Sequence, residues 1–159
     1  MNTGVLSLAV CEYVNFNALT KSFYLFDTYA GIPESQMSAI ERPHKQGSNT
    51  AYPDCYALAL ANFRPYPRAR LVRGMVPDTL STVAIDRVAY LSIDMNIAYP
   101  ERKAIEHFWP KLSSGAFVVL DDYAWYGFEE QRHSMDEFAR GTGVEILTLP
   151  TGQGLLVKP

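Results

Sequence analysis

Long apolar runs and clusters of basic residues are both scarce in this sequence. No run approaches the roughly 20 consecutive apolar residues that a membrane-spanning helix needs, so we expect no membrane association. The net charge is −3 at pH 7, and the basic residues are interrupted by prolines and apolar residues. Because phosphate contacts need clustered lysine and arginine, this distribution argues against nucleic-acid binding.

Cysteine is also rare, with only Cys11 and Cys55 in the chain. Each lies in an apolar pattern typical of a helix, and neither forms a metal-binding spacing with a histidine. We therefore expect two buried free thiols and a cytoplasmic location, since disulfides form in oxidising compartments.

What remains is the composition of an ordinary globular protein. The 159 residues are 48% hydrophobic and 19% charged, which suits one domain spanning 1–159. Short apolar strands alternate with helical patterns. Strands are expected at 22–28, 70–74, 87–94 and 116–122. Helices are expected at 3–14, 53–63, 100–112 and 128–140. The alternation predicts an α/β fold with a mostly parallel sheet.

Three details of this assignment can be checked directly. Asn2 or Thr3 is expected to cap the first helix, and Tyr56, Leu60 and Phe63 to form the buried face of the second. Residues 34–50 are polar and aperiodic, which is typical of a lid or binding loop. Residues 145–149 and 154–158 predict a closing antiparallel hairpin.

Acidic residues follow three of the predicted strands. Asp27 ends the first, Asp94 the third, and the pair Asp121 and Asp122 the fourth. Because the carboxyl ends of parallel strands share one edge of a sheet, these carboxylates should gather on one rim. Oxygen ligands of this kind suit Mg²⁺ or another hard divalent cation. For Asp27 two roles remain open, a local cap or a grip on a ribose.

Four segments carry a specific resemblance. They are 23–33 (FYLFDTYAGIP), 72–80 (VRGMVPDTL), 91–101 (LSIDMNIAYPE) and 111–123 (KLSSGAFVVLDDY). In order and spacing they resemble the macrocin O-methyltransferase-like (TylF-type) family. The resemblance implies a Rossmann-like class I methyltransferase sheet. It also implies transfer of a methyl group from S-adenosylmethionine to a hydroxyl of a small molecule, such as a sugar or natural product. Because several members of the family use Mg²⁺, it implies this ion as well.

The resemblance also implies roles for particular residues. Asp94, Asp121 and Asp122 match the metal ligands, and Asp94 would thereby take part in catalysis. The cofactor would be bound by residues of three segments. They are Gly4 at the start of the first helix, Asp27 and Thr28 at the ribose, and Gly74 and Met75 near the adenine.

The sequence departs from the family pattern at two places. Asn96 stands where an acid, sometimes proposed as general base, is common; an amide cannot take that proton. His44, in the lid segment, is the alternative base, whereas His107 fits a structural role better. The first strand and most of the glycine loop of the family are also expected to be missing before Gly4. We therefore expect stabilisation by another chain, such as a homo-oligomer partner, or by rearranged strand pairing.

Other functions were weighed against methyl transfer. A catalytically inactive methyltransferase-like domain, acting as a binding or structural module, is the main alternative. A receiver domain would carry its acidic pair at the first strand, and a dehalogenase-type phosphatase would need Asp-x-Asp where this chain has Asp27-Thr28-Tyr29. A dinucleotide oxidoreductase would need G-x-G-x-x-G, which is absent.

Overall fold

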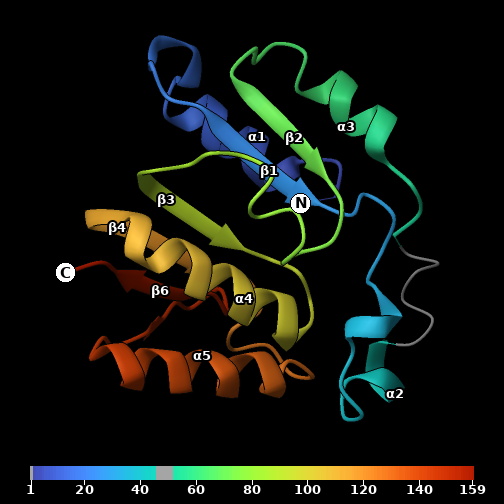
Figure 1. Ribbon diagram of the computed structural model, residues 1–159, viewed down its shortest axis with the longest axis vertical. Helices are drawn as coiled ribbons and strands as arrows, with labels where there is room; N and C mark the ends of the chain where they lie inside the picture. Colours follow the sequence, from blue (N-terminus) through green and yellow to red (C-terminus); the bar gives the residue numbers. More distant parts are fainter. Residues whose placement is uncertain (1, 46–51) are drawn as a thin grey trace.

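Two hydrogen-bonded sheets form the framework of residues 2–45 and 52–159, the part of the chain described by the computed structural model (Figure 1). In the first sheet, β1 (Phe23–Asp27) pairs in parallel with β2 (Ala69–Arg73). The register places Asp27 opposite Arg73, so both strands end at the same edge.

Helices α1 (Val5–Tyr13) and α3 (Tyr56–Asn62) accompany this first sheet. A short 3-10 turn, η1 (Phe16–Ala18), leads from α1 to β1. The buried residues that hold this part together are Cys11, Phe16, Leu25, Phe63 and Tyr66.

The second sheet has the strand order β3-β4-β6-β5. β3 (Val88–Ile93) and β4 (Leu112–Leu120) are parallel, whereas β6 (Gly154–Val157) runs antiparallel to both β4 and β5 (Leu147–Thr148). The α/β fold with its parallel strands and antiparallel closing hairpin is therefore confirmed. The hairpin strands are shorter than the sequence pattern predicts.

Helix α4 (Ala98–Phe108), which runs on into η4 (Trp109–Lys111), packs against β3 and against α5 (Glu129–Thr142). The main hydrophobic core lies beneath it, and Ile105 and Val118 there are completely buried. Burying side chains of this size contributes roughly 1.5–3 kcal/mol each. This core fixes the ends of β3 and β4 relative to each other.

Side-chain packing connects the two sheets. The rings of Phe26 in β1 and Phe108 in α4 have centroids 5.9 Å apart, and those of Phe23 and Tyr90 are 6.5 Å apart. Among residues 2–45 and 52–159 no strand pairs with both β1 and β3.

Two predictions about the helices are wrong. The residue that caps α1 is Gly4, in a left-handed conformation and with no side-chain hydrogen bond, rather than Asn2 or Thr3. Leu60 is 47% exposed, and the buried residue of α3 is Ala59. Phe63, from the same predicted face, is buried as expected, so the covered side is only rotated from Leu60 toward Ala59.

Two further details differ from expectation. Cys55 is a free thiol that is only partly buried, whereas Cys11 is buried as predicted. The lid segment contains η2 (Glu34–Gln36) and α2 (Arg42–Lys45), so it is more ordered than its polar sequence indicates. The rest of the predicted lid, residues 46–50, falls outside the described part of the chain.

Across residues 2–45 and 52–159, no helix combines the length and apolar character needed to cross a membrane.

Candidate active site

Three carboxylates meet at the ends of β3 and β4. One oxygen each from Asp94, Asp121 and Asp122 can be chosen so that all three lie within 4.8 Å of one another, and each residue is partly buried. The acidic rim predicted for these three residues therefore exists. Asp27 does not belong to this group and lies at the end of the other sheet.

The strand register explains why the three residues converge. Ile93 pairs with Leu120, so the next residues, Asp94 and Asp121, leave the sheet side by side. The Asp121 N–H donates to the Ile93 carbonyl at 3.0 Å, which extends the parallel pairing to the carboxylates themselves. Gln153, in the closing hairpin, orients Asp121 through a 3.0 Å bond from its Nε2 to Oδ1.

The three carboxylates of the acidic rim influence one another's charge. Burial, followed by the charges of Asp94 and Asp121, raises the pKa of Asp122 from its ordinary 3.8 to about 6. A cation placed among these oxygens would reverse this effect. Three carboxylate oxygens at such mutual distances are suitable ligands for Mg²⁺ or a similar ion, with water completing the coordination.

The turn that carries Asp94 is stabilised by hydrogen bonds to a buried glutamate, Glu101. Oε1 of Glu101, in the first turn of α4, accepts hydrogen bonds from the N–H groups of Met95 and Asn96 at 3.0 and 3.1 Å. Burial raises the pKa of Glu101 to about 8, against the effect of the Met95 hydrogen bond. Sequence analysis missed Glu101; a glutamate so soon after a turn is a capping signal that could have identified it.

Asn96 occupies the place where the resemblance implies an acid. It adopts a left-handed backbone with φ of 64°, a conformation that asparagine tolerates better than most residues. Its Nδ2 donates to Oδ1 of Asp94 at 3.3 Å. Asn96 therefore acts as a hydrogen-bond donor to the Asp94 carboxylate. Its amide cannot serve as a general base.

The lid segment brings a third set of charged residues to the rim. Glu41 is buried, and its Oε1 accepts the N–H of Ala98, the first residue of α4, at 2.6 Å. Its other oxygen accepts the Ser38 N–H at 2.8 Å, and Ser38 Oγ accepts the Glu41 N–H in return. This reciprocal capping box starts α2 and ties it to the Asp94 turn.

Lys45 ends α2 and is buried, with its Nζ 3.1 Å from the centroid of the Phe128 ring. Burial lowers the pKa of its ammonium, while the charges of Asp122, Glu41, Glu101 and Glu129 oppose that change. Nothing in the local sequence distinguishes Lys45 from an exposed lysine. Only the return of the lid segment onto the rim reveals it.

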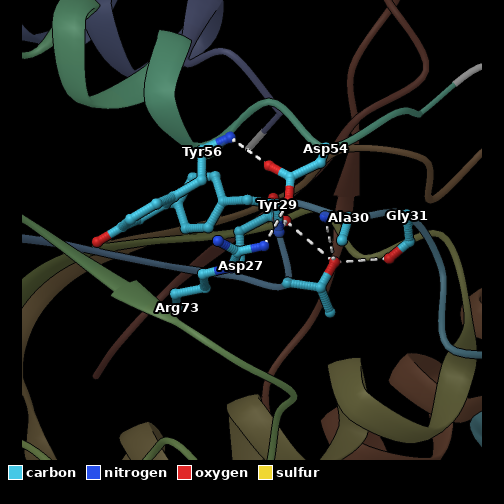
Figure 2. A network of polar contacts seen from close by, with 8 residues as sticks. Asp27, Tyr29, Ala30, Gly31, Asp54, Tyr56 and Arg73 are labelled. Atoms are coloured by element: carbon cyan, nitrogen blue, oxygen red, sulfur yellow. Dashed lines mark hydrogen bonds and ion pairs between the residues drawn. The ribbon is translucent and has the colours of Figure 1, made fainter.

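The end of β1 carries the predicted ribose site (Figure 2). Oδ1 of Asp27 accepts the Tyr29 N–H at 2.6 Å, and Oδ2 accepts the Asn2 N–H at 3.1 Å. Thr28 Oγ1 donates to the Gly31 carbonyl at 2.6 Å. Local turn chemistry, one of the two roles left open for Asp27, is therefore present. The same bonds fix the carboxylate at the edge of the sheet.

The end of β2 lies directly opposite. The Gly74 N–H donates to the Asp27 carbonyl at 3.0 Å, and Met75 beside it is exposed. Arg73 binds Asp54 at 2.5 Å and stacks over the ring of Tyr56, as Figure 2 shows. Asp27, Gly74 and Met75 thus share one edge, as the sequence predicts, with an Arg–Asp–Tyr group beside them.

The two candidate histidines lie apart. His44 is exposed on α2. His107 lies 2.7 Å from Nζ of Lys111 and edge-on to Phe108, and burial lowers its pKa. These packing contacts match the structural role predicted for His107.

The chain is similar in sequence to a known family and to characterised proteins. The family described as Macrocin-O-methyltransferase (TylF) matches residues 6–147. The Mycinamicin III 3''-O-methyltransferase of Micromonospora griseorubida is 24% identical over 147 residues, which is 84% of this chain and 58% of that protein. An 8-demethyl-8-(2,3-dimethoxy-alpha-L-rhamnosyl)-tetracenomycin-C 4'-O-methyltransferase of Streptomyces olivaceus is 30% identical over 110 residues, covering 64% of this chain and 41% of that protein.

The fold also matches solved structures. The O-methyltransferase NovP superposes with a TM-score of 0.79 at 22% identity, over 90% of this chain and 62% of NovP. The class I methyltransferase architecture predicted from the sequence is thereby confirmed. The chain spans less than two thirds of the length of each of these three relatives.

Proposed function

This chain belongs to the macrocin-O-methyltransferase (TylF) family, and from that premise we propose that its protein is an S-adenosylmethionine-dependent O-methyltransferase. The acceptor would be a hydroxyl group of a small molecule, of the sugar-bearing or natural-product class that the relatives' names describe. We further propose that a divalent cation, Mg²⁺ by its preference for oxygen ligands, assists the reaction.

One observation carries the proposal: carboxylates from the ends of two adjacent parallel strands converge within 4.8 Å. Asp94, Asp121 and Asp122 would hold the cation. In its absence burial, followed by the charges of Asp94 and Asp121, raises the pKa of Asp122. A hard cation bound at these oxygens supplies Lewis acidity, which lowers the pKa of an acceptor hydroxyl and orients it.

The cofactor would lie along the edge formed by β1 and β2. Asp27 and Thr28 would hold the ribose, and Gly74 and Met75 would lie near the adenine. The adjacent ends of β1 and β2 support this arrangement. Gly4 begins α1, whose first N–H groups would receive the anionic end of the cofactor. Its sulfonium cation would be favoured by the acidic rim.

Bound S-adenosylmethionine would supply an electrophilic methyl group, which would pass from its sulfur to the acceptor oxygen, with S-adenosylhomocysteine as the second product. The proton of the acceptor hydroxyl goes to a base, for which we propose His44 on α2, since Asn96 cannot serve. Asp94 would contribute by holding the cation next to the acceptor hydroxyl. With free thiols at Cys11 and Cys55, we expect the protein to work in a reducing cytoplasm.

Calorimetric titration with S-adenosylmethionine, with and without Mg²⁺, tests the proposal first. We expect binding, followed by methyl transfer to members of a panel of glycosylated hydroxyl acceptors. The double variant Asp121→Asn with Asp122→Asn should retain cofactor binding and lose methyl transfer by about 100-fold or more. Asp86→Asn, an exposed acid elsewhere, is the matched control.

Two results would overturn the proposal at different points. No binding of S-adenosylmethionine by the protein would favour the inactive binding module instead. Full activity in the double variant, or activity unaffected by chelation, would remove the metal role while leaving methyl transfer in place.

A further inference from the structure

A single buried oxygen atom holds the backbone that follows Asp94. Oε1 of Glu101, a residue only 5% exposed, accepts the N–H groups of Met95 and Asn96 at 3.0 and 3.1 Å. Nε2 of Gln131, in α5, lies 3.5 Å from the same oxygen. Two backbone donors of the turn and one side-chain donor of a neighbouring helix therefore surround one acceptor.

The turn needs this support because its backbone is strained at Asn96. A left-handed φ of 64° costs energy in most residues other than glycine, and it persists where the surrounding contacts impose it. The hydrogen bond from the Asn96 N–H to Glu101 is such a contact. In this conformation Nδ2 of Asn96 donates to Oδ1 of Asp94 at 3.3 Å. Glu101 is thereby linked to the Asp94 carboxylate through one intervening residue.

The burial of Gln131 points to the same oxygen. Gln131 is 2% exposed, and within the described part of the chain its Oε1 has no hydrogen-bond partner. An unpaired buried acceptor destabilises a fold, so packing alone would favour an apolar side chain at this position. What the amide adds is its Nε2 beside Oε1 of Glu101. Gln131 thus restricts the positions that the Glu101 carboxylate can adopt.

We propose that Glu101 is a positioning residue, which holds Asp94 in the geometry that binds the divalent cation before the cation arrives. This inference rests on the metal site of the proposed function and adds to it a residue outside the three converging carboxylates. Groups that orient metal ligands in this way commonly change the metal affinity by about 10–100-fold when they are removed. A glutamate that only capped α4 would stabilise the helix and leave the metal affinity unchanged.

The first experiment measures Mn²⁺ binding by the loss of the free-ion signal in electron paramagnetic resonance. Glu101→Met keeps a side chain of similar length but removes the acceptor of the Met95 and Asn96 N–H groups, and we expect about tenfold weaker binding. Glu101→Gln keeps an oxygen that can accept both N–H groups and should stay within about threefold of the wild type. Glu106→Met, the same substitution at an exposed position of α4, is the matched control and should bind like the wild type.

The stability of each variant is measured in parallel, because Glu101→Met also leaves two backbone donors unpaired. Urea unfolding with a chelator gives the loss of stability, and the Mn²⁺ titration is run where every variant is folded. A purely structural role lowers the stability of Glu101→Met and leaves the Mn²⁺ affinity of its folded state unchanged. A positioning role changes both, and Glu101→Gln restores the affinity.

Hydrogen exchange of the wild type tests the same inference without a substitution. In the metal-free protein, the N–H groups of Met95 and Asn96 should already exchange at least about tenfold more slowly than in an unstructured chain. Saturating Mg²⁺ should then change their rates by less than about threefold. A turn that only the cation organises would leave these two amides unprotected until Mg²⁺ is added.

The possible outcomes separate this inference from the proposed function. Three results would each overturn the positioning role and leave the metal site in place: unchanged Mn²⁺ affinity of folded Glu101→Met, equal weakening by Glu101→Gln or Glu106→Met, or unprotected Met95 and Asn96 amides in the metal-free wild type. A wild type that binds no Mn²⁺ would remove the metal site itself, and the positioning role with it.

Discussion

Replacing Asp122 by asparagine should make the metal-free protein more stable at high pH. Burial and the charges of Asp94 and Asp121 raise the pKa of Asp122 from 3.8 to about 6. A group whose pKa is raised by folding contributes its full stability below its ordinary pKa and loses it as the pH rises through the raised value. The wild type should therefore lose stability between about pH 4 and pH 7, and Asp122→Asn should not lose this part.

The magnitude follows from the size of the shift. About two pKa units at about 1.36 kcal/mol each set an upper limit near 3 kcal/mol. Asp122 is only partly buried and solvent screens its interactions, so we expect about 1–2 kcal/mol. The assay is urea unfolding with a chelator present, at about pH 4 and about pH 8, for the wild type, Asp122→Asn and the exposed control Asp86→Asn.

Magnesium should reverse the order of stability. An ion that binds only the folded state stabilises it, by about 2.7 kcal/mol at a hundredfold excess over its dissociation constant. The wild type should gain this stabilisation at about pH 8, and Asp122→Asn should gain much less. A stability difference between the two proteins that does not change with pH would refute the electrostatic reasoning, and equal stabilisation by Mg²⁺ would refute the metal site.

Two further predictions concern Glu101, beside the rim, and Gly74, at the end of β2. Burial raises the pKa of Glu101 to about 8, so the stability of the metal-free protein should also fall as the pH rises toward 8. In thermal melts, Glu101→Gln should show a smaller fall in stability with pH. Equal slopes of stability against pH for the two proteins would contradict this prediction. Gly74→Ala should destabilise by about 1–3 kcal/mol, because φ is 144° and a Cβ would lie 2.6 Å from Cγ2 of Thr79. Adding Thr79→Ser should restore part of that loss in denaturant unfolding, and no recovery would show that the methyl contact is irrelevant.

The sequence predicted the acidic rim because the signals involved are local. An apolar strand followed by acids is visible within eight residues, and the rule that parallel strands end at one edge supplies the rest. Asp94, Asp121 and Asp122 therefore converge as expected. Their roles as metal ligands, and those of Asp27, Gly74 and His44, remain predictions that the experiments above address.

The buried charges near the rim could not be predicted in the same way. Glu41 and Lys45 become buried only because the lid segment folds back onto α4 and α5, which no local pattern records. The prediction that Leu60 is buried was wrong for a related reason. A helical period shows which residues share a side, but the packing partners decide which side is covered, and in a helix of seven residues several sides are nearly equivalent.

The hydrogen bond from Gln153 to Asp121 connects the last strand pair to the proposed metal site. Asp121 owes its orientation to a residue that lies 32 positions further along the chain, between β5 and β6. A truncation or fusion that disturbs the turn between β5 and β6 would thus also change the orientation of Asp121. Chain ends chosen for expression should keep β6 and its turn whole.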